Sequence, residues 1–134
     1  MIYIVLNALP IALATAAGLA FGLLYFRFLG GGPLGGPRRN AAVGWIVTVA
    51  CEFWIASILA GALILAPPEA GPWTMAIGTA VVIWIGFVAP AIAVDAVRAE
   101  RPWIETGHTN VHWLGVMLAH VVVLQAMGLT PPPQ

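Results

Sequence analysis

Hydrophobic residues in this chain gather into four long segments with few polar positions inside them. The segments cover residues 2–28, 41–66, 73–97 and 107–129. Each one can supply the ~20 residues that a helix needs to cross the hydrocarbon core of a bilayer. Backbone groups in lipid must be hydrogen-bonded within their own segment, so we interpret all four as α-helices. The sequence therefore predicts an all-α fold, an integral membrane four-helix bundle forming one domain over residues 1–134.

The connections between these segments contain glycine, proline and seven of the ten charged residues. All five basic residues are arginines, and they flank the first connection or lie in the third: Arg27, Arg38, Arg39, Arg98 and Arg101. The second connection carries only Glu69. The positive-inside rule places arginine-bearing connections in the cytoplasm. We therefore expect an up-down-up-down bundle with both termini on the non-cytoplasmic side.

Composition supports lipid as the main solvent of this chain. Hydrophobic residues make up 61% and charged residues 7%, against roughly 25% charged in soluble proteins. The net charge is zero, so nothing indicates a nucleic-acid partner. Abundant Ala, Gly and Pro without lysine is typical of a GC-rich bacterial genome. We expect a multi-pass protein of the bacterial cytoplasmic (inner) membrane.

Two ionisable residues lie deep inside predicted helices. Glu52 is about 11 residues, and His120 about 13 residues, from the cytoplasmic end of its helix, which puts both roughly 16–20 Å deep. A lone carboxylate at this depth is costly, so Glu52 should be neutral or paired. We predict that Glu52 and His120 form a buried polar pair. Two interpretations stay open: a midplane site for a proton or ligand, and a structural clasp.

Other polar residues suggest weaker sites. His108 and His112 are spaced i, i+4, which allows a metal on one helix face, but no H-E-x-x-H motif is present; interfacial polar residues are the simpler interpretation. His120 is also a candidate axial ligand to a porphyrin or chlorin, although the sequence requires no cofactor. The only cysteine, Cys51, is interpreted as a packing residue. The charged residues of the third connection, from Asp95 to Glu105, are expected to form a solvated salt-bridge cluster.

Small residues indicate how the helices pack. Ala14, Gly18 and Gly22 form a small-xxx-small ladder, which lets helix backbones approach closely in lipid. We favour packing within the chain over a homodimer seam. Pro10 and Pro90 each remove a backbone hydrogen bond and are expected to kink their helices.

Two deep tryptophans, Trp54 and Trp84, are expected to pack inside the bundle or against a partner.

Short motifs along most of the chain resemble a family. They are Gly22-Leu23-Leu24-Tyr25, Trp84-Ile85-Gly86-Phe87, Arg101-Pro102-Trp103, and a last helix with Gly115 and Gly128. Together they resemble the DUF1761 family of small bacterial four-helix membrane proteins. The first connection departs from the family, which often has a phenylalanine- and tryptophan-containing segment there. The family's function is unknown, so the resemblance implies a topology and a bacterial membrane, and it assigns no catalytic residue.

Three functions fit these features. The first is a non-catalytic accessory or structural subunit of a larger membrane complex, with other membrane subunits as partners and a homo-oligomer as a further option. The second is a small transporter or binding protein for a hydrophobic ligand or proton that uses Glu52 and His120. The third is a membrane enzyme, which ranks last because no nucleophile–base pair or metal triad is visible.

Overall fold

The protein is described here by a computed structural model that covers residues 2–29, 41–67 and 71–133. The secondary structure in these ranges is helical: α1 (Ile2–Leu6), α2 (Ala8–Phe28), α3 (Ala41–Ile64), α4 (Pro72–Ile83), the π-helical turn η2 (Trp84–Val88), α5 (Ala89–Arg98) and α6 (Trp103–Met127). Four spans are long and apolar enough to cross a membrane, since α4, η2 and α5 form one continuous span. The predicted all-helical fold with four long apolar helices is therefore confirmed.

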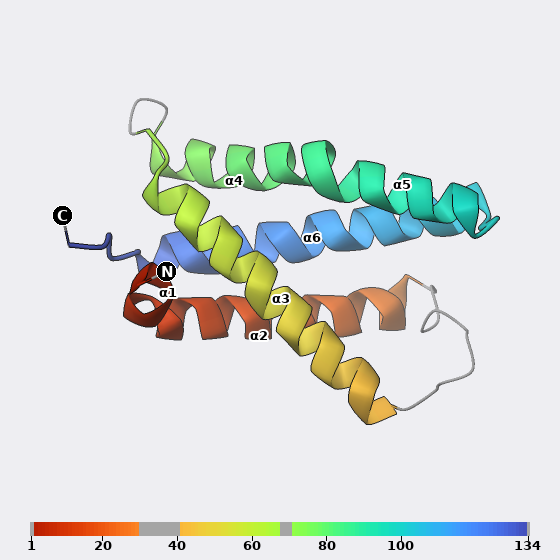
Figure 1. The fold of residues 1–134 in the computed structure, drawn as a ribbon, viewed down its shortest axis with the longest axis horizontal. Coiled ribbons are helices and arrows are strands. Elements are labelled where there is room, and N and C mark those ends of the chain that lie inside the picture. Colours follow the sequence, from red (N-terminus) through yellow and green to blue (C-terminus); the bar gives the residue numbers. More distant parts are fainter. Residues whose placement is uncertain (1, 30–40, 68–70, 134) are drawn as a thin grey trace.

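α6 is the central helix of the fold. It packs most extensively against α2 and also contacts α3, α4 and α5. α3 crosses the other helices at a steep angle, while α2, α6 and the α4–α5 helix lie closer to a common direction (Figure 1). The apolar core consists of small and branched side chains from α2, α3, α4 and α6: Ile11, Ala14, Ala56, Leu59, Ala60, Ala76, Ala80, Met117, Val121 and Leu124.

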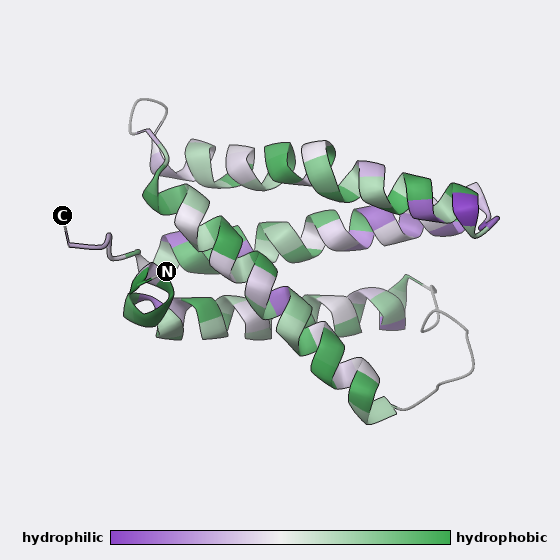
Figure 2. Ribbon diagram, viewed as in Figure 1, coloured by the Kyte–Doolittle hydropathy of each residue, from purple (hydrophilic) through white to green (hydrophobic). Residues whose placement is uncertain are grey.

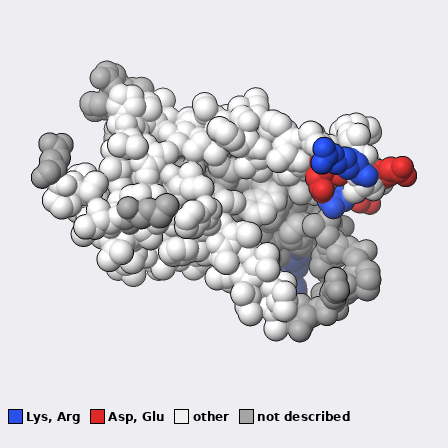
Figure 3. All heavy atoms as spheres, viewed as in Figure 1, with Lys and Arg blue, Asp and Glu red and all other residues white. Residues whose placement is uncertain are grey.

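The two ends of the molecule differ in polarity. Hydrophilic and charged side chains gather where α5 and α6 meet, which we call the charged end (Figures 2 and 3). Arg101 forms an ion pair there with Asp95 at 3.1 Å, and both side chains are exposed. The opposite end, which we call the terminal end, holds α1 and the C-terminal residues (Figure 1).

A buried asparagine joins the chain's two ends. Asn7 separates α1 from α2 and is 1% exposed. Its side-chain amide donates a hydrogen bond to the Thr130 carbonyl at 2.9 Å and accepts one from the Thr130 N–H at 2.8 Å. These reciprocal bonds hold the segment after α6 against the start of α2. Asn7 was not singled out from the sequence, although a lone amide in an apolar segment is itself a signal of a buried hydrogen bond.

The two helix-internal prolines act in different ways. Pro10 falls in the first turn of α2, where a proline is tolerated, and the helix breaks three residues earlier at Asn7. α1 and α2 run in clearly different directions (Figure 1). Pro90 follows the π-helical turn η2, in which the Ala89 N–H donates to the Trp84 carbonyl. The span therefore continues through Pro90 by widening one turn, a common device at helix irregularities.

Candidate functional site

Glu52 and His120 lie together where α3 crosses α6. His120 Nε2 is 3.7 Å from Glu52 Oε2, and the side chains are 0% and 3% exposed, respectively. The structure thus brings together the two residues that the sequence pairs by depth. α3 and α6 do contact each other, so the two side chains meet directly between these helices.

Gly18 of α2 forms the floor beneath this pair. A Cβ atom placed on Gly18 would overlap His120 Nε2 and Glu52 Oε2. The acid and the imidazole therefore occupy space that exists only because α2 has no side chain there. Three helices contribute one residue each to this position, so the site depends on the contact between α2 and α6 as well as on α3.

The polar atoms of the pair are not fully hydrogen-bonded within the described residues. Glu52 Oε2 and both ring nitrogens of His120 are buried without a hydrogen-bond partner there. Buried polar atoms in native proteins are normally bonded, because an unmade bond in low dielectric costs about 1–3 kcal/mol. Within the described residues, His120 Nε2 and Glu52 Oε2 thus lie 3.7 Å apart without a hydrogen bond between them.

The predicted ladder of Ala14, Gly18 and Gly22 is buried at the α2–α6 interface. A Cβ on Gly22 would lie 3.0 Å from His112 Nε2. A glycine of α6 makes a matching contact with a ring of α2, since a Cβ on Gly115 would overlap the ring of Phe21. Gly18 and Gly22 of this ladder therefore face histidine side chains of the same chain.

His108 and His112 contact the aromatic end of α2. The Tyr25 hydroxyl donates to the His108 carbonyl at 3.0 Å and lies 3.4 Å from His108 Nδ1. The His112 ring stands 4.7 Å from the Phe26 ring and 5.5 Å from the Tyr25 ring, centre to centre. The sequence did not single out Tyr25 as a site residue; its hydroxyl near the end of an apolar helix was the available signal.

Metal and porphyrin binding find no support in the geometry. Within the described ranges, no three His, Cys, Asp or Glu side chains are grouped so that they would hold a metal ion. A porphyrin on His120 needs an open plane beside a ring nitrogen. Gly18 and Glu52 fill the Nε2 side, and the Nδ1 atom is also buried, so the residues present do not fit this group.

Two other sequence interpretations change in the structure. Cys51 is exposed on α3, so it does not pack inside the bundle. The two deep tryptophans lie in different environments. Trp84 donates its indole N–H to the Asn110 carbonyl at 3.0 Å, whereas Trp54 is 51% exposed. Trp84 thus packs within the chain, and Trp54 faces outward.

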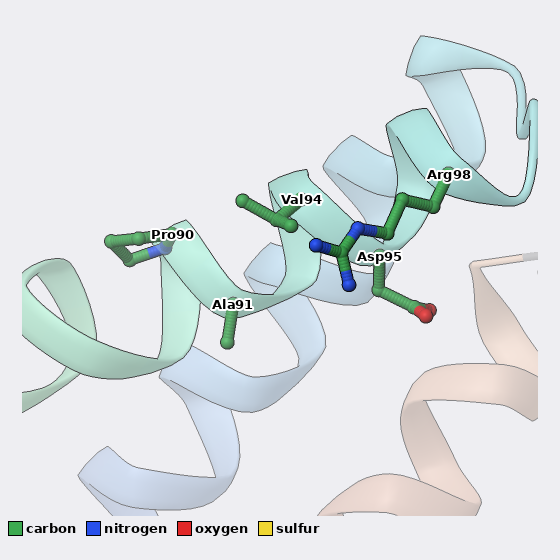
Figure 4. A pocket seen from close by; sticks show the side chains of 5 residues that line it. All are labelled: Pro90, Ala91, Val94, Asp95 and Arg98. Atoms are coloured by element: carbon green, nitrogen blue, oxygen red, sulfur yellow. The ribbon is translucent and has the colours of Figure 1, made fainter.

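An open hollow lies on the outer surface of α5. It is lined by Pro90, Ala91, Val94, Asp95 and Arg98 (Figure 4). A second one near the terminal end lies between the last turns of α3 and α6. Neither hollow is lined by Glu52 or His120.

Comparison of the chain with protein-family models, curated proteins and solved structures gives no match. The resemblance to the DUF1761 family therefore stays a prediction.

Replacing Gly18 with alanine should disturb the pair directly. The new methyl group would overlap His120 and Glu52, so we expect the unfolding free energy in mild detergent to fall by about 1–3 kcal/mol. The matched control is Gly78→Ala in α4, where a Cβ would meet nothing within 4 Å. It should be neutral or slightly stabilising, because alanine favours helix. Equal stability of both variants would contradict the close contact at Gly18.

Proposed function

We propose that the four apolar spans cross the bacterial cytoplasmic membrane in alternating directions, with the charged end in the cytoplasm. The described arginines of α5 and the following turn, Arg98 and Arg101, lie at that end, and Arg27 is in the last turn of α2. The terminal end carries no basic residue. This distribution favours both termini on the non-cytoplasmic side.

A small tag fused to either terminus should be accessible from the outside of intact cells. The positive-inside rule predicts this placement for both tags. Protease protection of the two tags in right-side-out and inverted vesicles measures it. Protection of both tags in right-side-out vesicles, with cleavage in inverted ones, would reverse the proposed orientation.

We propose that the chain is a non-catalytic accessory subunit of a larger membrane complex, which it joins through the first half of α3. The carrying observation is that all eleven residues from 41 to 51 are exposed. The remainder of α3 is different, since Glu52, Ala56, Ser57, Leu59 and Ala60 are buried. The first three turns of α3 therefore extend away from the core.

This exposed half carries a stripe of small side chains along one face. Ala41, Gly44, Thr48 and Cys51 follow each other at helical spacing, and a Cβ on Gly44 would meet nothing within 4 Å. Lipid tails are as apolar as leucine, so helix association in a membrane relies on close packing at small residues. Trp45, four residues after Ala41 and three before Thr48, borders this stripe. An exposed stripe of small residues fits a helix of another subunit better than it fits lipid.

Gly44→Leu should release the protein from its complex. The leucine would fill the stripe and block close approach of a second helix. The control is Ala50→Leu, which adds similar bulk to an exposed position on another face of α3. We expect at least a tenfold loss of co-purifying subunits from native membranes in mild detergent for Gly44→Leu alone, measured by mass and composition. A wild-type protein that is recovered exclusively as a monomer would contradict the subunit function.

A second function is favoured by the buried acid–base pair of Glu52 and His120. We propose that this pair reversibly binds a proton near the membrane midplane. Ionisable side chains in membrane spans are costly and usually serve ion or proton chemistry. The pair holds an acid and a base 3.7 Å apart, with buried polar atoms that have no hydrogen-bond partner among the described residues. This function is compatible with a role as a subunit.

The proton-binding function predicts that His120 titrates. In ¹⁵N-histidine-labelled protein in lipid nanodiscs, the His120 ring signals should change between their neutral and imidazolium positions within a range of pH in which the protein stays folded. Glu52→Gln removes the acid of the pair and should change the pH dependence of the His120 ring signals. Glu105→Gln, at an exposed carboxylate of α6, is the control and should leave it unchanged. A His120 signal that never changes would identify the pair as a static clasp.

A further inference from the structure

A row of titratable side chains leads from the charged end of the protein to the buried pair. Gly18 and Gly22 are one turn apart on α2, about 6 Å along the helix axis. Gly18 faces His120 and Glu52, and Gly22 faces His112 Nε2. His112 and the pair therefore lie along one glycine-lined strip of α2, with His112 nearer the charged end.

Glu52 is placed to connect His112 with His120. Its Oε2 atom is 3.7 Å from His120 Nε2. The same oxygen lies against Gly18, one helical turn from Gly22, which His112 Nε2 faces. That oxygen has no hydrogen-bond partner among the described residues. Rotation about the side-chain bonds of a glutamate lets its carboxyl turn from one histidine toward the other.

The row continues outward from His112. The His112 side chain is largely buried, and its residue is 8% exposed, whereas His120 is 0% exposed. The Tyr25 ring stands beside it, and the Tyr25 hydroxyl is bonded to the His108 carbonyl next to the His108 ring. Groups that can carry or accept a proton thus reach from the pair toward the charged end.

The opposite direction is closed by apolar side chains. Ile11, Ala14, Val121 and Leu124 are fully buried between the pair and the terminal end. The nearby Thr15 hydroxyl is bonded to the Ile11 carbonyl of its own helix at 2.8 Å. α4 and η2, which pack on the other side of α6, contain no titratable side chain. The buried Ser57 hydroxyl of α3 likewise donates to the Phe53 carbonyl of its own helix at 2.8 Å. The row of titratable side chains therefore ends at Glu52 and His120.

We propose that His112 carries protons between water at the charged end and the Glu52–His120 pair, and that the pair is closed toward the terminal end. In the inward step, one nitrogen of His112 takes a proton from hydronium while its other nitrogen gives a proton to the Glu52 carboxylate. The Glu52 carboxyl then passes that proton to His120, and release follows the same steps in reverse. Only N–H and O–H bonds form and break, and one proton moves from water to the pair. This inference rests on the proton-binding function proposed above.

The test measures how fast the ring N–H of His120 exchanges with D₂O in ¹⁵N-histidine-labelled protein in nanodiscs. His112→Phe keeps an aromatic ring against Phe26 but cannot carry a proton, and it should slow the exchange at least tenfold. The mirror control is Thr15→Val, which removes the polar side chain on the other side of Gly18 and should leave the rate unchanged. His112→Leu replaces the phenylalanine variant if that variant does not fold.

Three results would overturn the route. They are an unchanged rate in the His112 variant, a slower rate in Thr15→Val, and a wild-type His120 N–H that does not exchange. A failure of the proton-binding function looks different, because His120 would then show no titration in the wild type. If His120 titrates and the His112 variant exchanges at the wild-type rate, the route alone is wrong.

Discussion

The close approach of α2 and α6 is the constraint on which the rest of this structure depends. Inside lipid there is little gain from burying apolar surface, so two helices stay together through close packing. Gly18 and Gly22 on α2, and Gly115 on α6, permit this approach. Each glycine lies against a ring of the other helix, so the backbones come close while aromatic and imidazole groups fill the seam. α3 and α4 then pack around this pair of helices.

The same glycines also create the chemistry of the site. A helix seam of larger residues would leave no volume for an imidazole and a carboxyl between three helices. Glycine thus lets the protein place Glu52 and His120 deep between helices, and their depth makes a charge on either of them expensive unless it is matched. Packing and protonation are coupled here, since any shift of α2 against α6 changes the space that both side chains occupy.

The sequence predicted the positions of long helices and of deep polar residues because both depend on counting along a regular helix. Residue counts put Glu52 and His120 at one depth, and the structure has them 3.7 Å apart. The face that each helix turns toward the bundle could not be predicted. Nearly every side chain of these spans is apolar, so no polar stripe distinguishes the inward face from the outward one. For this reason the exposure of Cys51 contradicts the packing role that we expected of it. It is also why the sequence left open whether Trp54 packs inside the bundle or faces outward, as the structure has it. The π-helical turn before Pro90 also escaped prediction, since a proline is compatible with several local distortions.

The hydrogen bonds between Asn7 and Thr130 join residues that lie 123 positions apart. During synthesis Asn7 is made long before Thr130, and domains begin to fold from the side that is made first. The Asn7 side chain therefore cannot make these hydrogen bonds until α6 and Thr130 have been made. These bonds can therefore form only after all the helices between Asn7 and Thr130 have been made.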